Sequence, residues 1–182
     1  TCALPICIIR LPHIANFTDF HALAQIKGLQ TIFIDQANHL SKCKAIIIPG
    51  SKNTRADLEW LTKNFKGSLQ KYYQSKGRIF GICGGYQMLG EFVDDPDGLE
   101  GIPGKTEALN LLPVQTVLKA PKTTTVSEFQ WADAKGKGYE IHMGYTTLSA
   151  GASLIEINSR NSISCADTDG CVSNGGDRKS VV

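Results

Sequence analysis

Residues 78–90 constrain the fold of this chain more than any other segment, because they place a cysteine among glycines between a strand-like run and a helix-like stretch. A short apolar run leads to Cys83, and a helix-like stretch follows it. This change predicts a strand, a sharp turn and a helix, with the thiol projecting at the turn in the manner of a nucleophile elbow. The neighbouring Gly81, Gly84 and Gly85 relieve the crowding that such a turn creates. We therefore expect an α/β fold whose sharpest turn presents Cys83.

Two interpretations of Cys83 compete. A lone cysteine in an apolar run is ordinarily a small buried side chain of the core. Flanking glycines weaken a strand and have no packing purpose there, so they favour a nucleophile. The N-terminus of the following helix would favour both a thiolate and a developing oxyanion. Because a free thiol with a pKa of about 8.5 is mostly protonated at neutral pH, we expect the site to lower the pKa of Cys83.

Composition excludes several classes of function. The 182 residues are 42% hydrophobic and 20% charged, which suits one domain with a proper core. A formal net charge of +2 predicts neither a nucleic-acid partner nor a membrane partner. Apolar runs fall short of the ~20 residues that cross a bilayer, and the first residues do not resemble a signal peptide. Without such signals we expect a cytoplasmic domain. The chain also begins without a methionine, so we expect it to be cut from a longer protein.

The spacing of the cysteines predicts free thiols and no metal centre. They show neither a C-x-x-C pair nor a zinc-like spacing with histidine. A chain that can build its own core does not need a disulfide framework, so we expect free cytosolic thiols. The six are Cys2, Cys7, Cys43, Cys83, Cys165 and Cys171.

Strands and helices are expected to alternate over the first half of the chain. Apolar runs predict strands at residues 6–10, 30–34 and 44–48, and helices are predicted at residues 20–27, 55–64 and 67–76. This alternation indicates a parallel sheet, whose ligands bind outside the carboxyl ends of the strands. Residues 49–54 and 83–87 are therefore candidate site loops. After a loop at residues 94–104, strands without clear helices predict a partly antiparallel region.

A family resemblance rests on four segments. Gly81, Cys83, Gly85 and Gln87 form a G-x-C-x-G-x-Q motif that resembles the nucleophile motif of class I, triad-type glutamine amidotransferases. Residues 10–20, 49–54 and 138–144 resemble, in order, segments of the amidotransferase domain of cobyric acid synthases. The resemblance implies a flavodoxin-like three-layer α/β domain with a mostly parallel central sheet. It would cover residues 1–176 of a parent protein that continues at both ends, with residues 177–182 as a non-native tail.

The same resemblance implies a function. Members of the family release ammonia from L-glutamine for the ATP-dependent amidation of adenosylcobyrinic acid a,c-diamide in cobalamin biosynthesis. ATP and Mg²⁺ would be bound by an N-terminal synthetase domain of the same parent chain, which also takes the corrinoid substrate. This chain has no G-x-x-x-x-G-K-[ST] phosphate loop, so we expect it to be the glutaminase half and to hold no cofactor or metal itself.

Residue roles follow from the resemblance. Cys83 would attack the side-chain amide carbon of glutamine, and the backbone N–H groups of Gly84 and Ser51 would form the oxyanion hole. The glutamine pocket would be lined by Gly50, Gly85, Tyr86 and Gln87. For Tyr86 and Gln87 the alternative is an ordinary place in the first turn of a helix, which requires neither side chain.

The general base is the point where this sequence departs from the family. The family's catalytic histidine lies in a Tyr-Leu-His-Gly type segment downstream of the cysteine, and the 182 residues contain no such segment. His142 is the only histidine after Cys83, and it is a candidate base or a structural residue at the end of a strand. His13, His21 and His39 are interpreted as surface or loop residues.

Two alternatives therefore stay open beside the glutaminase. One is a non-catalytic docking domain that lacks the triad histidine. The other is the amidotransferase domain of a cobyrinic acid a,c-diamide synthase.

Overall fold

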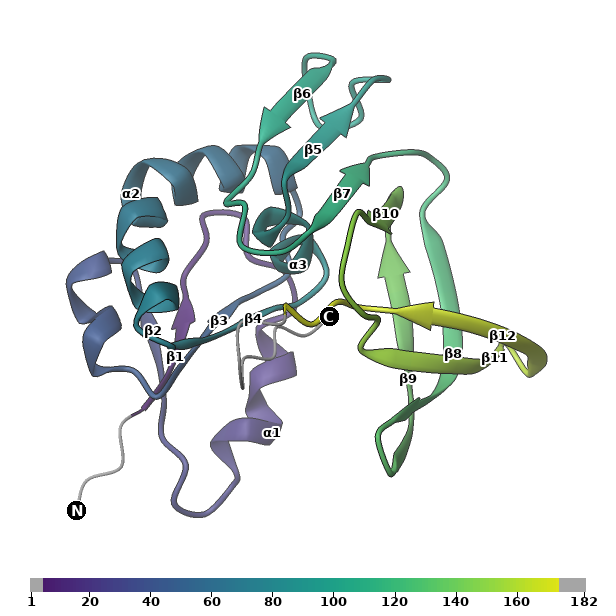
Figure 1. Ribbon diagram of the computed structural model, residues 1–182, viewed down its shortest axis with the longest axis horizontal. Coiled ribbons are helices and arrows are strands. Elements are labelled where there is room, and N and C mark those ends of the chain that lie inside the picture. The colour runs from purple at the N-terminus through teal and green to yellow at the C-terminus, as the bar shows by residue number, and fades with distance from the viewer. Residues whose placement is uncertain (1–4, 174–182) are drawn as a thin grey trace.

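A parallel four-stranded sheet lies at the centre of the N-terminal half of the chain (Figure 1). The computed structural model describes residues 5–173, so the predicted tail at residues 177–182 lies outside the described residues. The strands are β1 (Ile6–Ile9), β2 (Thr31–Ile34), β3 (Ala45–Ile48) and β4 (Arg78–Gly81), in the order β2-β1-β3-β4. This is the flavodoxin-like order, with a switch point between β1 and β3. It confirms the predicted fold class.

The helices pack beside this sheet. They are η1 (Phe17–Phe20), α1 (His21–Ala24), η2 (Ala37–Lys42), α2 (Thr54–Gln74) and α3 (Gly84–Leu89). Asn53 caps α2 by accepting a hydrogen bond from the Ala56 N–H at 3.1 Å. The prediction of two helices here was wrong, because α2 runs unbroken through Gly67. Its buried face outweighs the cost of one glycine, and that face consists of Leu58, Leu61, Phe65 and Leu69.

Two further sheets form the rest of the molecule. The mixed sheet contains β5 (Phe92–Asp95), β6 (Gly104–Glu107), β7 (Val114–Val117) and β10 (Tyr145–Leu148), in the order β10-β7-β5-β6. The antiparallel sheet contains β8 (Thr123–Trp131), β9 (Ala134–His142), β11 (Ile155–Arg160) and β12 (Ile163–Asp169), in the order β12-β11-β8-β9. In Figure 1 the antiparallel sheet lies on the side opposite α2. The predicted antiparallel region is thus confirmed, although β5, β6, β10, β11 and β12 were not individually predicted.

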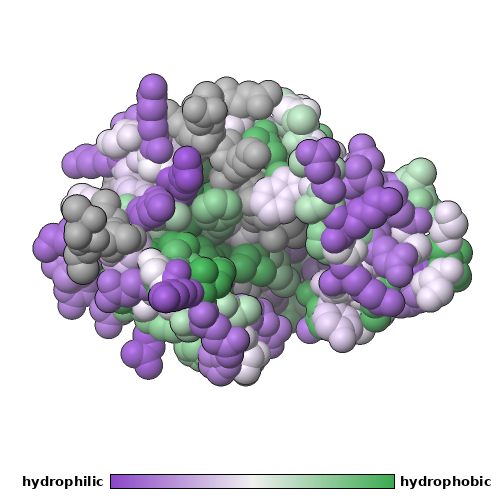
Figure 2. All heavy atoms as spheres, turned by 90° about the horizontal axis from the view of Figure 1, so that it is seen from below, coloured by the Kyte–Doolittle hydropathy of each residue, from purple (hydrophilic) through white to green (hydrophobic). Residues whose placement is uncertain are grey.

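The main hydrophobic core joins the parallel sheet to α2, α3 and the mixed sheet. Ile48, Leu61, Met88 and Val114 belong to it and are fully buried. The antiparallel sheet contributes few buried apolar side chains, of which Ile157 is one. Figure 2 accordingly shows hydrophilic residues over that side of the molecule and apolar residues gathered toward the middle of the face. Within residues 5–173, none of the helices combines the length and hydropathy of a membrane span.

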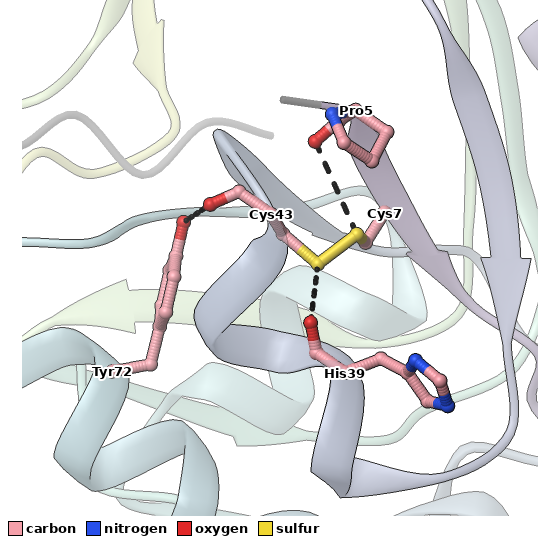
Figure 3. Close-up of a disulfide and its surroundings, with 5 residues drawn as sticks. All are labelled: Pro5, Cys7, His39, Cys43 and Tyr72. Atoms are coloured by element: carbon pink, nitrogen blue, oxygen red, sulfur yellow. Dashed lines mark hydrogen bonds between the residues drawn. A yellow bond between two sulfur atoms is a disulfide. The ribbon is translucent and has the colours of Figure 1, made fainter. Parts of the chain in front are cut away.

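A disulfide joins Cys7 to Cys43, so the prediction of free thiols was wrong for this pair (Figure 3). Cys7 lies on β1, and Cys43 precedes the neighbouring strand β3. Strand pairing brings the two Cα atoms to 5.7 Å across a separation of 36 residues, a proximity that spacing alone does not reveal. The hydroxyl of Tyr72 donates to the carbonyl of Cys43 at 3.1 Å. Three cysteines, Cys83, Cys165 and Cys171, are free, and Cys2 lies outside the described residues.

Candidate active site

Loops from three strands meet at the carboxyl edge of the parallel sheet. Residues 10–16 follow β1, residues 49–53 follow β3, and Cys83 lies between β4 and α3. The first two loops are joined by backbone hydrogen bonds from Ala15 N to Gly50 O at 2.9 Å and from Lys52 N to His13 O at 2.8 Å. The loops in which the site is predicted therefore lie at the switch point of the sheet.

Cys83 occupies a strained turn. Its φ of 50° and ψ of −114° lie outside the regions that non-glycine residues prefer. The turn depends on close packing of α3 against the sheet, since a Cβ atom on Gly85 would lie 2.0 Å from the carbonyl oxygen of Ile48. A Cβ atom on Gly81 would lie 2.6 Å from the nitrogen of Tyr86. The predicted strand, turn and helix are confirmed, and both glycines are required by contact with backbone.

A second loop brings a backbone amide against the residue that follows Cys83. A Cβ atom on Gly84 would lie 3.1 Å from the nitrogen of Ser51, so the Ser51 amide lies directly against the residue after Cys83. The equivalent position on Gly50 is 3.7 Å from the Cβ atom of Cys83. The structure thus brings together Cys83, Gly84, Gly50 and Ser51, which come from two loops. Paired N–H groups beside a thiol are an arrangement that can receive an oxyanion.

The electrostatic surroundings of Cys83 differ from the expectation. Burial raises the pKa of the Cys83 thiol, and the negative charges of Asp19 and Glu100 add to that increase. The backbone N–H of Gly84 and the charge of Lys122 act in the opposite direction without overcoming burial. The thiol donates to the carbonyl of Ile141 at 3.4 Å. The predicted lowering of the pKa is therefore not found, and the raised pKa favours the thiol over the thiolate.

Tyr86 and Gln87 are both buried in the packing around the turn. Tyr86 is 5% exposed, and its pKa is raised by burial and by the neighbouring Cys171 and Asp169. Gln87 is 6% exposed, and its amide donates to the carbonyl of Met143 at 3.4 Å. Both residues thus have a structural role, and their contact with glutamine stays a prediction.

His142 directly follows a residue that contacts Cys83, but its own ring contacts other groups. Its neighbour Ile141 contacts the Cys83 sulfur, whereas the Nδ1 atom of His142 lies 3.1 Å from the carbonyl oxygen of Gly144. Its Nε2 atom lies 4.0 Å from Glu140, which also pairs with Arg160 at 2.9 Å. Among residues 5–173, no imidazole nitrogen is hydrogen-bonded to Cys83. The role of His142 as a base stays a prediction.

Asp57 is a residue of this site that the sequence analysis did not identify. Its carboxylate is fully buried on α2 and accepts hydrogen bonds from the backbone N–H of His13 at 3.0 Å and from the Ser51 hydroxyl at 2.6 Å. The Nδ1 atom of His13 lies 2.8 Å from the same carboxylate. An aspartate in the first turn of a capped helix is an ordinary sequence signal, and only the fold brings the two loops to it. In the part of the chain that the structure describes, there is no group of three or more His, Cys, Asp or Glu side chains that could hold a metal ion.

Comparison with known proteins agrees with this geometry. Residues 5–181 match the family of CobB/CobQ-like glutamine amidotransferase domains. A cobyric acid synthase of Chlorobium phaeobacteroides (strain BS1) is 44% identical over 181 residues, covering 93% of this chain and 35% of its own length. A cobyric acid synthase of Herpetosiphon aurantiacus is 44% identical over 175 residues, with the same coverage. The chain thus spans about a third of the length of these relatives.

Solved structures extend the likeness to the fold. The structure of PurLQS from Thermotoga maritima is similar with a TM-score of 0.70 at 14% identity, covering 99% of this chain and 87% of that one. A crystal structure of a glutamine amidotransferase is similar with a TM-score of 0.63, also at 14% identity, covering 97% of this chain and 87% of that one. These likenesses show the fold. The family match over nearly the whole sequence shows that the chain belongs to the CobB/CobQ-like glutamine amidotransferase domains.

Proposed function

We propose that this chain is the glutaminase part of a cobyric acid synthase. The observation that carries the proposal is Cys83 at a strained strand-to-helix turn beside the backbone amides of Gly84 and Ser51. Its family and the names of its relatives supply the reaction class. In this proposal the domain hydrolyses L-glutamine and delivers ammonia for the amidation of adenosylcobyrinic acid a,c-diamide.

The chemistry assigns one role to each group. A base takes the proton of Cys83, and the sulfur then forms a bond to the side-chain amide carbon of glutamine. The Gly84 and Ser51 N–H groups stabilise the oxyanion, and its collapse breaks the C–N bond and releases ammonia after proton transfer to nitrogen. Water hydrolyses the resulting thioester to glutamate and regenerates the thiol. For His142 to be the base, its ring must leave the carbonyl of Gly144.

The length comparison is consistent with a partner domain, since the chain spans 35% of the length of its relatives. In this proposal an N-terminal synthetase domain carries out the ATP- and Mg²⁺-dependent activation of the corrinoid carboxylate. The proposed place of the reaction is the cytoplasm.

A Cys83→Ser variant of the full-length protein that contains this chain tests the proposal. We expect glutamine-dependent amidation of adenosylcobyrinic acid a,c-diamide to fall by about 10³-fold or more. Amidation with added ammonium salt should stay unchanged, because it bypasses the thiol. Cys165→Ser, which alters another free cysteine, is the matched control and should keep both activities. Equal loss of both activities in Cys83→Ser, or turnover of cobyrinic acid instead of its a,c-diamide, would contradict the proposal.

A docking domain without glutaminase activity is the second candidate, because the pKa of Cys83 is raised and no described imidazole is bonded to it. The glutamine analogue 6-diazo-5-oxo-L-norleucine separates the two. A glutaminase should be labelled at Cys83 far faster than at Cys165, and glutamine should protect it. Labelling of Cys83 no faster than of Cys165, as mapped by mass spectrometry, would favour docking.

A further inference from the structure

The buried carboxylate of Asp57 requires an explanation. It is fully buried on α2, and burial of a carboxylate is costly unless hydrogen bonds compensate. The described contacts that compensate it come from outside α2: the backbone and ring of His13, and the hydroxyl of Ser51. Asp57 therefore joins the loop after β1 and the loop after β3 at the point where they meet.

The contacts around Asp57 fix the backbone of residues 51–53. The Ser51 hydroxyl donates to Asp57 at 2.6 Å and accepts from the Asn53 N–H at 3.0 Å. The Lys52 N–H donates to the carbonyl of His13, whose own N–H donates to Asp57. The two loops thus hold each other through one carboxylate, and Ser51 has little freedom to move.

The position of Ser51 matters because its amide lies against Gly84. The nitrogen of Ser51 is 3.1 Å from where a Cβ atom on Gly84 would stand. An oxyanion donor must be held in place before the reaction, since a misplacement of about 1 Å can cost about a hundredfold in rate. We propose that Asp57 is a positioning residue that holds the Ser51 N–H where the oxyanion of the glutamine reaction forms, an inference that rests on the proposed function.

A carboxylate suits this position better than an amide. Each described partner of Asp57 from the two loops is a donor: a backbone N–H, a hydroxyl and an imidazole nitrogen. Asparagine has nearly the same size but turns one acceptor into an N–H₂ group. Facing His13, that group meets a backbone N–H that can only donate. Facing Ser51, it keeps a contact only if the hydroxyl turns round to accept, so in either case a present hydrogen bond is lost and the two loops are held less firmly. Asp57→Asn is therefore a specific probe of the contact.

The experiment compares reactions that do and do not form an oxyanion, in the full-length protein. For Asp57→Asn we expect the glutamine-dependent kcat to fall about 10- to 100-fold, with KM changed less than about threefold. Ammonium-dependent amidation should be unchanged. Alkylation of Cys83 by iodoacetamide, which passes through no oxyanion, should stay within about twofold. Glu59→Gln, an exposed acidic position on the same helix, is the matched control and should behave as wild type.

Ser51 provides a second variant if Asp57→Asn does not fold. Ser51→Ala keeps the N–H but removes the hydroxyl link, so we expect a fall in kcat of about 3- to 10-fold. Ser51→Thr, which keeps a hydroxyl, should restore most of it. Where both single variants fold, the double variant should be no worse than Asp57→Asn, because the two changes break one contact.

Three results would overturn the inference. They are a kcat for Asp57→Asn equal to that of Glu59→Gln, a kcat for Ser51→Ala equal to wild type, or a fall in iodoacetamide reactivity parallel to the fall in kcat. Glutamine use that survives in Cys83→Ser would instead overturn the proposed function, and this inference with it. If Cys83→Ser loses glutamine use while Asp57→Asn keeps the full kcat, the inference about Asp57 is overturned and the proposed function stands.

Discussion

Burial is the largest cause of the raised pKa of Cys83, and charges of both signs around it modify that effect. The carboxylates of Asp19 and Glu100 raise its pKa, and Lys122 lowers it. Glu100 is held in place, since its carboxylate accepts the Arg55 N–H at 2.8 Å and its own N–H donates to Asp95 at 2.9 Å. A fixed negative charge near the nucleophile opposes the thiolate, so removing it should increase reactivity.

Glu100→Gln tests this at the scale of one residue. Glutamine keeps an oxygen for the Arg55 N–H but carries no charge, so the pKa of Cys83 should move down toward its usual value. Because more thiolate is then present at neutral pH, we expect iodoacetamide to alkylate Cys83 about twofold faster. The pH profile of alkylation should shift to lower pH. Glu107→Gln, an exposed position on β6, is the control, and an unchanged or slower rate in Glu100→Gln would contradict the argument.

Two helices of the domain contain glycine for different reasons. In α3, Gly85 packs so closely on the end of β3 that a Cβ atom would lie 2.0 Å from the Ile48 carbonyl oxygen. In α2, Gly67 has nothing within 4 Å of where its Cβ atom would stand. The first glycine is required by packing, whereas the second only lowers the helix propensity of its element.

The pair Gly85→Ala and Gly67→Ala measures that difference between elements. Gly85→Ala forces α3 away from the sheet and should lower the free energy of unfolding by about 2–4 kcal/mol, with loss of Cys83 reactivity toward glutamine analogues. Gly67→Ala should raise it by about 0.5–1 kcal/mol through helix propensity. Urea denaturation followed by circular dichroism provides both values. A neutral Gly85→Ala would show that the close contact at the turn is not a constraint.

At the scale of the whole molecule, Arg55 and Asp95 connect the parallel sheet's long helix to the mixed sheet. The Arg55 guanidinium lies 3.4 Å from the fully buried Asp95 and donates to Thr106 at 3.0 Å. Burial raises the pKa of Asp95, but the N–H groups of Glu100 and Leu99 together with Arg55 outweigh it. The pKa of Asp95 is therefore below its usual value.

A lowered pKa in the folded state makes stability depend on pH. Asp95 stabilises the fold fully above the unfolded-state pKa of about 3.9, and this contribution is lost as the pH falls through the lower folded-state pKa. Asp95→Asn should cost about 2–4 kcal/mol at neutral pH, because it leaves Arg55 without its carboxylate. The variant should also lose less stability than wild type on acidification. Unfolding free energies measured across acidic pH check both points, with the exposed Asp97→Asn as control, and parallel pH curves would contradict them.

Local patterns were sufficient for the parallel sheet and the turn at Cys83. Runs such as residues 45–48 are apolar on both faces, which is typical of a strand covered on both sides. The glycines around Cys83 permit the tight backbone turn that other residues would crowd. The start of α2 was likewise predicted to within one residue of Thr54, and its cap at Asn53 is a contact within a few residues. These features depend on neighbours in the sequence, so the sequence by itself determined them.

The tertiary structure decided what depends on residues far apart in the chain. The continuity of α2 through Gly67 depends on the core against which it packs, and the pairing of Cys7 with Cys43 depends on the order of β1 and β3. The raised pKa of Cys83 follows mainly from burial, and its thiol contacts the Ile141 carbonyl 58 residues further along the chain, which no local pattern shows. Asp57 became part of the site for the same reason, because its partners lie on two loops that only the folded sheet brings together.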